Sequence, residues 1–544
     1  MIEQLHPAPP SHRWSSLDVP LLPFPLVHRR LDYMAVLALE RLVDVQEGLH
    51  GVLARRHIVQ AGASIARTAG VDASGPGALC ARSRPRCAKI TAMSTVADLI
   101  VRRFVEAGVR GLFGMPGGGS NLDLLEAAAR ADVPFVLSHT ETAGALMACA
   151  QAEITRAPGA CLATLGPGVA SLANGVAHAR LDRVPLVVVT DGLPVAVRRT
   201  YDHQALDHAA FLAPLVKRSV LVEPRDDGHA AAAAIAAALA PPPGPVHLDC
   251  PSDVAPGRPR RDAAHGPAAA TRATATGAAA HLPAPLLAGS RRPLVIAGLG
   301  IGTASEAARL RALCERRGMP ALVTYKAKGV VPDTHPSFAG VFTHAALEEP
   351  FVRSADLIVA VGLDPVELLP RPWTYPQPVV ACGPWPNDGR HVPVAAQATG
   401  DLDDLVAALD ERLRADTAWS ASEIRRQADG QREALRIEAA GFAPYRAVEA
   451  AARAAGPGAR VTVDAGAHMF PIVALWPVSE PRQMLISNGL STMGYALPAA
   501  IGAALLDRPR RSRGRPRGRG SRPARASRPC QARRRRCGAP AAPV

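Results

Sequence analysis

The sequence has few aromatic residues, no closely paired cysteines and no long uncharged apolar run. Phe, Trp and Tyr make up only 4% of the 544 residues, which leaves few side chains for stacking on nucleic-acid bases. The nine cysteines include no CxxC pair, so neither a zinc site nor a disulfide framework is indicated, and we expect a reducing, cytoplasmic environment. No run of 18 or more uncharged apolar residues occurs outside alanine-rich segments, so no membrane span is predicted.

Acidic residues are absent from the C-terminal stretch 508–544, which contains fourteen arginines. Subtracting these fourteen charges from the net charge of +15 leaves only +1 for the rest of the chain, so the basicity belongs to one tail. An arginine-rich tail can bind nucleic acid, but this one offers neither aromatic side chains nor a basic helix face. We therefore do not expect a nucleic-acid partner, and keep binding through the tail as an alternative that deletion of 508–544 would test.

Apolar residues make up 48% of the chain and charged residues 20%, as in globular proteins with large cores, and the length suits about three domains. Short, continuously apolar runs alternate with helical periods, which predicts parallel sheets covered on both faces, with function at the carboxyl ends of the strands. We predict three doubly wound α/β units, an irregular N-terminal extension and a disordered basic tail. The predicted segments are the extension 1–92, a first unit 93–254, a linker 255–291, a second unit 292–405, a helical linker 406–443, a partial third unit 444–507 and the tail 508–544. In the second unit, strands are expected in RPLVIAGLGIG, MPALVTY, ADLIVAVGL and QPVVACG.

Two glycine-rich turns follow predicted strands and are candidates for phosphate binding through backbone N–H groups. GLFGMPGGG (111–119) is neither a Walker A sequence nor a full GxGxxG fingerprint, and it can equally be a tight turn. AGLGIG (297–302) lacks the acidic residue that a dinucleotide site carries about 20 residues further on, so nicotinamide binding is not expected there. Glu141, in VLSHTETAGALMA, follows a buried strand and opens an alanine-rich helix. It is either a carboxylate stabilised by the helix dipole or a functional group.

The order of these pieces is more specific than any one of them. FGMPGG, SHTETAGALMA, ACLATLGPGVASLANGVAHA, PLVVVTDGLP and GPVHLDCPSDV follow one another within residues 113–254. This order resembles the pyrimidine-binding domain of thiamine diphosphate enzymes of the acetolactate synthase and 2-keto acid decarboxylase superfamily. YKAKGVVPDTHP and ADLIVAVG resemble that family's central domain. VTVDAGAHMFPIVALW and LISNGLSTMGYALPAAIGAAL resemble the opening of its diphosphate-binding domain, so the resemblance covers about residues 93–507.

The resemblance implies thiamine diphosphate as the cofactor and gives roles to particular residues. Glu141 falls at the position of the family's glutamate beside N1′ of the aminopyrimidine, where a carboxyl stabilises the imino tautomer that removes the thiazolium C2 proton. Met493 matches the bulky apolar residue that bends the cofactor, although a methionine can also simply fill a core. The other implied cofactor-binding residues are Pro116 and Gly117 near the pyrimidine, Leu490 and Ser491 beside Met493, and His468 near the diphosphate.

Two stretches depart from the acetolactate synthase pattern. GAHM (466–469) stands where those enzymes have a GQHQ-like stretch, and His203 and Ala205 flank Gln204 where they have phenylalanine and glutamate. Gln204 is kept as a weak candidate for substrate contact. These departures put acetolactate specificity in doubt, and FAD binding stays undecided.

The family's metal ligands are not found in this sequence. A GDG motif with a later asparagine should follow to hold Mg²⁺, but after Asp507 the chain contains no Asp, Glu or Asn, so no metal ligand is assigned. Arg, Pro, Gly and Ala are what GC-rich codons give in a wrong reading frame, and codons for residues 517–520 permit Gly-Asp-Gly one base later. We therefore expect a frameshift near codon 508 and a chain that is inactive as written; raw nucleotide reads across that codon would test this.

The sequence thus predicts a thiamine diphosphate-dependent carboligase or decarboxylase acting on a small 2-keto acid, which it does not identify further. The resemblance implies a homodimer or homotetramer, because in the family the pyrimidine-binding domain of one chain faces the diphosphate-binding domain of another. The alternative is a non-catalytic α/β remnant or a binding protein of the same fold.

Overall fold

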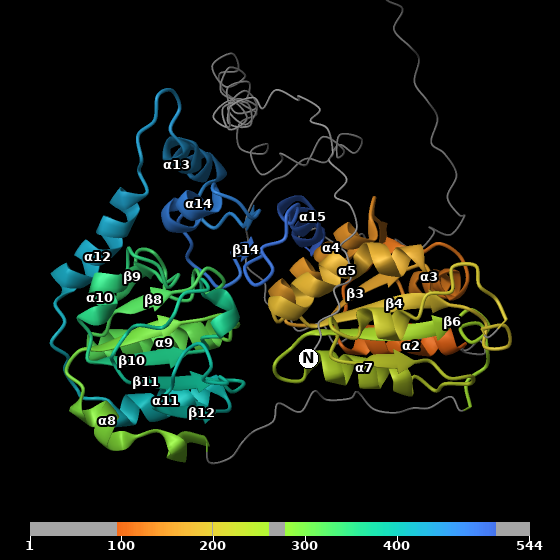
Figure 1. Ribbon diagram of the computed structural model, residues 1–544, viewed down its shortest axis with the longest axis horizontal. Helices are drawn as coiled ribbons and strands as arrows, with labels where there is room; N and C mark the ends of the chain where they lie inside the picture. Colours follow the sequence, from red (N-terminus) through yellow and green to blue (C-terminus); the bar gives the residue numbers. More distant parts are fainter. Residues whose placement is uncertain (1–94, 199, 261–277, 507–544) are drawn as a thin grey trace, which may run out of the picture. The chain divides into compact units, whose positions relative to one another are not determined.

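The protein is described here by a computed structural model that covers residues 95–198, 200–260 and 278–506 (Figure 1). These residues form two six-stranded sheets and one two-stranded sheet, and all the strand pairs are parallel. The predicted α/β class with doubly wound parallel sheets is therefore confirmed. The predicted extension, the arginine-rich tail and the middle of the predicted linker 255–291 lie outside the described residues.

The first sheet has the strand order β2-β1-β3-β4-β6-β5. Strand β2 lies on one side of β1, and β3 and the later strands lie on the other side, so the direction of winding reverses between β1 and β3. In open α/β sheets, such a switch point is where ligands bind, at the carboxyl ends of the strands. The strands are β1 (Leu112–Met115), β2 (Phe135–Leu137), β3 (Gly159–Ala163), β4 (Leu186–Gly192), β5 (Ser219–Leu221) and β6 (Pro245–Pro251).

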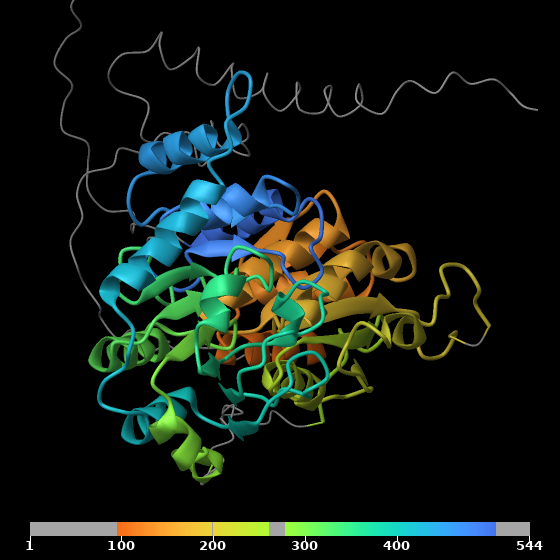
Figure 2. The same ribbon diagram turned by 60° about the vertical axis from the view of Figure 1, so that its left-hand side comes forward.

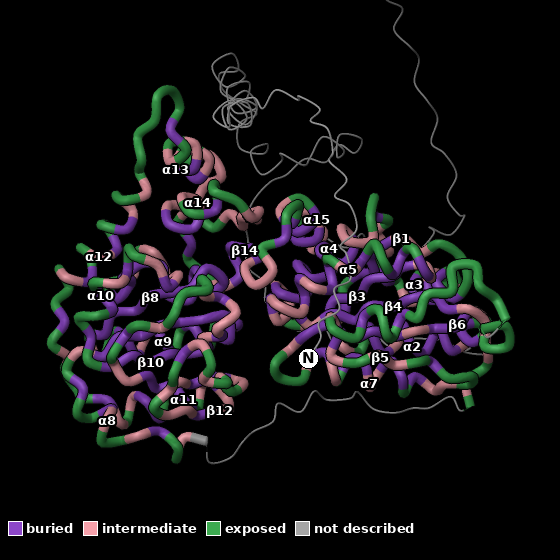
Figure 3. The backbone as a smooth tube through the Cα atoms, in the orientation of Figure 1, coloured by how far each residue is buried: buried purple, intermediate pink, exposed green. Residues whose placement is uncertain are grey.

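Helices cover both faces of this sheet (Figures 1 and 2). One apolar core lies between the sheet and α2, α3 and α7, and a second lies between the sheet and α4 and α5. Figure 3 shows the strands as mostly buried. The helices are α2 (Val96–Glu106), α3 (Ser120–Arg130), α4 (Glu141–Thr155), α5 (Pro167–Leu181), α6 (His208–Leu212) and α7 (His229–Leu239).

The second sheet has the order β12-β11-β10-β7-β8-β9, with its switch point between β7 and β10. The four predicted strand segments hold β7, β8, β10 and β11, whereas β9 and β12 were not predicted. Its elements are η1 (Ala278–His281), α8 (Ala284–Gly289), β7 (Pro293–Ala297), α9 (Ala304–Arg317), β8 (Ala321–Val323), β9 (Phe338–Val341), α10 (Glu349–Arg353), β10 (Leu357–Val361), η2 (Pro365–Glu367), β11 (Val379–Gly383), β12 (Ala396–Thr399) and α11 (Leu402–Arg412).

The last described segment has only two strands, and its final helix α15 packs on α4 of the first sheet (Figure 1). A Cβ on Gly502 would lie 2.5 Å from the carbonyl oxygen of Met147, and Gln151 Nε2 donates to Gly502 O at 3.0 Å. Glycine in α15 therefore allows the two helix backbones to approach closely. The elements are α12 (Ala421–Ala434), α13 (Pro444–Ala455), β13 (Val461–Val463), α14 (Met469–Leu475), β14 (Met484–Ile486) and α15 (Ala496–Leu506).

Among the described residues, no helix has the length and apolar character needed to cross a bilayer. The five cysteines in this part of the chain are all buried and form no disulfide.

Candidate active site

Two glycine-bearing turns meet at the switch point of the first sheet. The turn after β1 contains Pro116 and Gly117, and Gly117 has φ +62° with a Cβ position that would collide with the side chain of Thr164, in the turn after β3. Only glycine satisfies both conditions. The buried Asn121 joins the same turns, because its Nδ2 donates to Pro116 O at 2.8 Å and to Ala163 O at 2.9 Å.

The N-terminus of α3 is occupied by a carboxylate from within the chain. Asp191, at the end of β4, accepts from Ser120 N at 3.0 Å and from Ser120 Oγ at 2.7 Å. Burial raises the pKa of this carboxyl above its usual value. The glycine turn at 111–119 was a candidate phosphate cradle, but the Ser120 N–H at the start of its helix is bonded to Asp191.

Glu141 is the first residue of α4 and is partly exposed. Thr140 caps the helix by accepting from Ala143 N at 3.1 Å. The Glu141 carboxyl points toward the start of α5, where a Cβ added to Gly168 would lie 3.5 Å from Glu141 Oε1 and 2.8 Å from the Thr164 methyl group. The Glu141 carboxyl and Gly117 therefore both lie beside the turn after β3, which contains Thr164.

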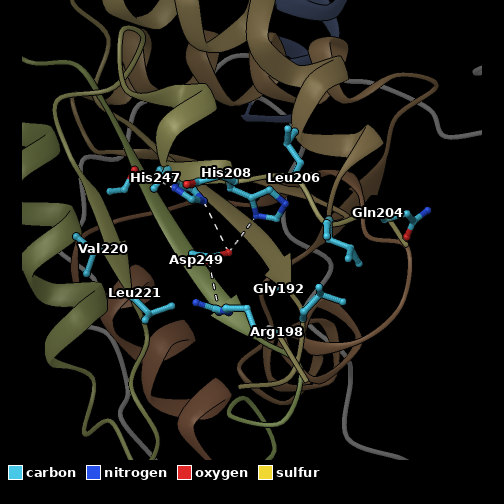
Figure 4. A pocket seen from close by; sticks show the side chains of 15 residues that line it. Gly192, Arg198, Gln204, Leu206, His208, Val220, Leu221, His247 and Asp249 are labelled. Atoms are coloured by element: carbon cyan, nitrogen blue, oxygen red, sulfur yellow. Dashed lines mark hydrogen bonds and ion pairs between the residues drawn. The ribbon is translucent and has the colours of Figure 1, made fainter. Parts of the chain in front are cut away.

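Gln204 lies on the other side of the turn that contains Thr164, at a pocket of about 480 Å³ at the carboxyl ends of β4 and β6 (Figure 4). Gln204 is exposed, and its backbone packs on Gly166, whose Cβ would lie 2.8 Å from Gln204 O. The polar wall of the pocket includes His208, His247 and Asp249, none of which sequence reasoning selected. The signal available was weak: His247 and Asp249 lie two positions apart on β6, but His208 comes from α6, about 40 residues earlier.

Hydrogen bonds fix the protons in this cluster. His208 Nε2 accepts from Gly166 N at 3.1 Å, so the neutral ring carries its proton on Nδ1, which donates to Asp249 at 3.3 Å. Thr190 donates its hydroxyl proton to Asp249 at 2.9 Å, and it therefore accepts from His247 Nε2 at 2.7 Å. Burial lowers the pKa of His247 to about 4, so this ring is neutral at pH 7. Burial works against the charge of Asp249, but the hydrogen bond from His208 helps to lower its pKa below the usual value.

The same cluster has the composition of a metal site, because ligand atoms of His208, His247 and Asp249 lie within 4.8 Å of one another. Imidazole and carboxylate together suit transition metals. Each of these side chains already has hydrogen-bond partners within the chain, so we interpret the cluster as a closed hydrogen-bond network and assign no metal to it.

The stretch that contains Leu490, Ser491 and Met493 is shaped by Asp464, which follows β13. Its carboxylate accepts from Gly494 N at 2.9 Å and from Tyr495 N at 3.4 Å. Met493 itself is 83% exposed, which rules out core filling within the described chain. Leu490 is half-buried and Ser491 is exposed with φ +52°.

His468 is exposed at the start of α14. It lies in the turn after β13, four residues from Asp464. The structure therefore gathers His468 and Met493 around the end of β13, apart from the Glu141 turn.

Contacts on α4 and α5 anchor the Met493 stretch. Thr492 donates to Asn174 on α5 at 3.0 Å, and Tyr495 reaches Glu153 on α4 with its hydroxyl at 3.4 Å. Glu153 lies twelve residues after Glu141, about 18 Å along α4, whereas Gly175, next to Asn174, packs against Thr142 and Ala145 near the start of α4. The stretch therefore spans much of the length of α4.

A buried charge cluster, which sequence reasoning missed, joins three distant segments. Lys326 Nζ lies 2.9 Å from Glu153 Oε2 and 3.0 Å from Asp182 Oδ1, and donates to Ile486 O at 3.1 Å. All three charged side chains are at most 5% exposed. Burial works to lower the pKa of Lys326, but Asp182 and Glu153 raise it above its usual value. Asp182 Oδ1 also accepts from Asn488 N at 2.9 Å, so the cluster holds the start of the Met493 stretch.

Three family models match the chain in the order that its motifs predict. They describe the thiamine pyrophosphate enzyme N-terminal TPP binding domain (residues 94–211), central domain (283–409) and C-terminal TPP binding domain (464–514). The large subunit of acetolactate synthase isozyme 1 from Escherichia coli (strain K12) is 28% identical over 76% of this chain and 74% of its own length. The catabolic acetolactate synthase of Raoultella terrigena is 30% identical over 76% of each chain. A protein of Pseudomonas aeruginosa named "Probable 2-ketoarginine decarboxylase" is 30% identical over 76% of this chain and 75% of its own length.

The doubly wound sheets and the glycine turns that meet at a switch point define an α/β enzyme scaffold of the cofactor-binding type. The chain belongs to the thiamine pyrophosphate enzyme family, whose members are thiamine diphosphate-dependent enzymes of the transferase and lyase type. The predicted family is confirmed, and with it the expectation of thiamine diphosphate as cofactor.

Proposed function

We propose that this chain is built to act as a carboligase or decarboxylase on a 2-keto acid. Its relatives are named as acetolactate synthases and as a 2-ketoarginine decarboxylase. The observation that carries the proposal is the convergence of Glu141 and Gly117 on Thr164, at the carboxyl ends of β1 and β3. A titratable carboxyl beside an open glycine turn suits a flat heteroaromatic ring that must exchange a proton.

The residues fit the pyrimidine end of thiamine diphosphate, which when bound supplies the carbon nucleophile and the electron sink for decarboxylation. Glu141 would hold a proton at N1′ of the aminopyrimidine. Its place at the N-terminus of α4 stabilises the carboxylate between proton transfers. Pro116 and Gly117 would line the ring through their backbone, and Gly117 keeps this turn packed on Thr164, because a Cβ there would collide with the Thr164 side chain.

The exposed Met493 is proposed to support the cofactor from a second chain, giving a homodimer or homotetramer. An apolar side chain that is 83% exposed has no packing partner among the described residues and is available to a second chain. Sedimentation velocity on the purified chain tests the association, and a concentration-independent monomer would contradict it.

We further propose that the chain as written is inactive, because residues 508–544 contain no Asp, Glu or Asn, the residue types that the family's Mg²⁺ motif uses. Calorimetric titration with thiamine diphosphate, with and without Mg²⁺, should show at most weak binding that the metal does not strengthen. Tight, magnesium-dependent binding would overturn the inactivity. A chain with the reading frame restored after codon 507 that folds but does not turn over any 2-keto acid would favour the alternative of a non-catalytic scaffold.

The role of Glu141 is tested with the reading frame restored after codon 507. Glu141→Gln keeps the size of the side chain but removes its titration, so exchange of the thiazolium C2 proton, followed by NMR in deuterium oxide, should slow strongly while cofactor binding persists. Glu126→Gln, at an exposed glutamate on α3, is the matched control. Unchanged exchange in Glu141→Gln would remove this residue from the mechanism.

A further inference from the structure

The second sheet has the topology of a dinucleotide-binding fold. Numbered along the chain, its strands lie in the order 3-2-1-4-5-6, and the turn Gly298–Thr303 follows the first of them at the switch point between β7 and β10. In such folds, the pyrophosphate of a dinucleotide binds free backbone N–H groups of this turn and of the following helix start. The availability of these N–H groups therefore decides whether a flavin or nicotinamide dinucleotide can bind here.

Three of the turn's N–H groups are bonded to backbone carbonyls. Gly298 N donates to Val361 O at 2.9 Å, Gly300 N donates to Gly362 O at 2.8 Å, and Ile301 N donates to Gly298 O at 3.1 Å. A Cβ on Gly300 would lie 2.9 Å from the Cα of Gly362. The turns after β7 and β10 are thus in direct contact across the switch point.

The other three N–H groups are bonded to carboxyl groups of the chain itself. Leu299 N donates to Glu367 Oε2 at 2.9 Å, and Gly302 N and Thr303 N both donate to Glu306 Oε2 at 2.9 Å. Glu306 belongs to the capping box that starts α9. A pyrophosphate would have to displace these two side chains from the N–H groups that it needs.

Two residues near β14 donate hydrogen bonds to the turn Gly298–Thr303 and to Glu367 beside it. Arg482 Nη2 donates to Leu299 O at 2.9 Å, and Asn488 Nδ2 donates to Glu367 O at 3.0 Å. Arg482 and Asn488 flank β14, which leads into the stretch that contains Met493. The second sheet's switch point therefore contacts the segment that carries the proposed cofactor support.

The first sheet's helices contribute two further arginines. Arg183, just after α5, donates through Nε to Asp364 Oδ2 at 2.7 Å, and Asp364 caps the short helix that contains Glu367. Arg156, at the end of α4, lies against Gly302, where an added Cβ would collide with the guanidinium. Both arginines approach the turn from segments far away in sequence.

We infer that the switch point of the second sheet is a docking site for the chain's own α4–α5 end and β14 segment, and that it does not receive a dinucleotide. The crevice that would hold a flavin pyrophosphate is closed by Glu367, Glu306 and the Gly362 turn. This inference is independent of the proposed function, because thiamine diphosphate is assigned to the first sheet and to the Met493 stretch.

The first test is direct binding of the probes FAD and ADP to the purified full chain. We expect no flavin absorbance in the protein as isolated and no saturable quenching of tryptophan fluorescence by either compound. Circular dichroism with a cooperative thermal transition verifies that the sample is folded. Stoichiometric flavin in the folded protein, or saturable binding of FAD or ADP, would overturn the inference and leave the thiamine diphosphate proposal untouched.

The docking role is tested by hydrogen exchange of the Leu299 region. Glu367→Ala frees the Leu299 N–H and should speed its exchange, whereas Glu367→Gln keeps an acceptor oxygen and should restore protection. Arg482→Met should speed exchange both in 298–303 and in 481–484, because the Arg482 side chain joins these two segments through its hydrogen bond to Leu299 O. Arg390→Met, at an exposed ion pair with Asp388, is the control and should change neither segment. Unaltered exchange of both segments in Arg482→Met would refute the docking role.

Discussion

Removal of the charge of Lys326 should strongly destabilise the fold. In Lys326→Met, the stem of the side chain still fills its volume, but the Nζ atom 2.9 Å from Glu153 and 3.0 Å from Asp182 is lost. The carboxylates of Glu153 and Asp182, which are at most 5% exposed, then lose their lysine partner. The arginine contact that remains joins Arg482 Nη1 to Glu153 at 3.8 Å. Breaking a buried ion pair by deleting one partner costs roughly 3–5 kcal/mol.

The assay is unfolding by urea and by heat, compared with the unchanged protein. A loss of about 4 kcal/mol should lower the thermal midpoint by about 8–16 °C, at roughly 2–4 °C per kcal/mol for domains of this size. Arg390→Met, at an exposed pair, controls for loss of one positive charge and should have little effect. Adding Glu153→Gln and Asp182→Asn to Lys326→Met should recover much of the stability, because neither buried carboxylate then remains without its lysine, and Arg482 keeps its hydrogen bond to Leu299 O.

A loss below about 1 kcal/mol in Lys326→Met would refute this reasoning, since that is the range of exposed pairs. It would show that water reaches the cluster and screens its charges. A triple variant less stable than Lys326→Met would also contradict the argument, because neutral amides should be easier to bury than two carboxylates.

Three further predictions concern single groups. Burial works to raise the pKa of Asp182, but Lys326 and His178 lower it well below its usual range. The Asp182 carboxylate therefore stabilises the fold above pH ~4, and this contribution is lost as the pH falls further. In Asp182→Asn the free energy of unfolding should depend less on pH in acid, and an unchanged slope would contradict the pairing. Burial raises the pKa of Glu367 to about 8, so the unchanged protein should lose stability as pH rises from about 4.5 to 8, and Glu367→Gln should remove this loss in urea titrations at several pH values. Gly117→Ala places a methyl group against Thr164 at a residue with φ +62°, and it should lower the free energy of unfolding in urea by more than about 1 kcal/mol. Gly118→Ala, where the added Cβ has open space, is the control. Equal effects of the two substitutions would contradict the close approach of the two turns.

The strands of the second sheet were predictable where they are continuous apolar runs. PLVIA, ALV, LIVAV and VVACG are buried on both faces, and the sequence shows them as such. By contrast, β9 reads FAGV after a turn-rich stretch and β12 reads AQAT, and neither is distinctive in isolation. These two strands are fixed by pairing with β8 and β11, which is a tertiary effect.

The candidate site was predictable only in part. Glu141 and Gly117 stand out because each follows a strand at a helix start, where parallel sheets place their functional groups. Lys326 and Asp182 are separated by more than a hundred residues, and their meeting depends on how α5 contacts the second sheet. His208 and His247 likewise come from different elements, so no spacing rule finds them. Met493 carries no local sign of its exposure, because its neighbours Thr492 and Tyr495 are buried.

The hydrogen bonds that Asp464 accepts from the Met493 stretch have a consequence for engineering. Asp464, Gly494 and Tyr495 all precede the last described residue, and their hydrogen bonds are complete within the described chain. The stretch around Met493 is therefore shaped by contacts upstream of position 507. Under the proposed loss of the metal-binding motif, a donor segment from a relative, spliced on after Leu506, would supply that motif. It does not have to reshape the surface on which the motif would assemble.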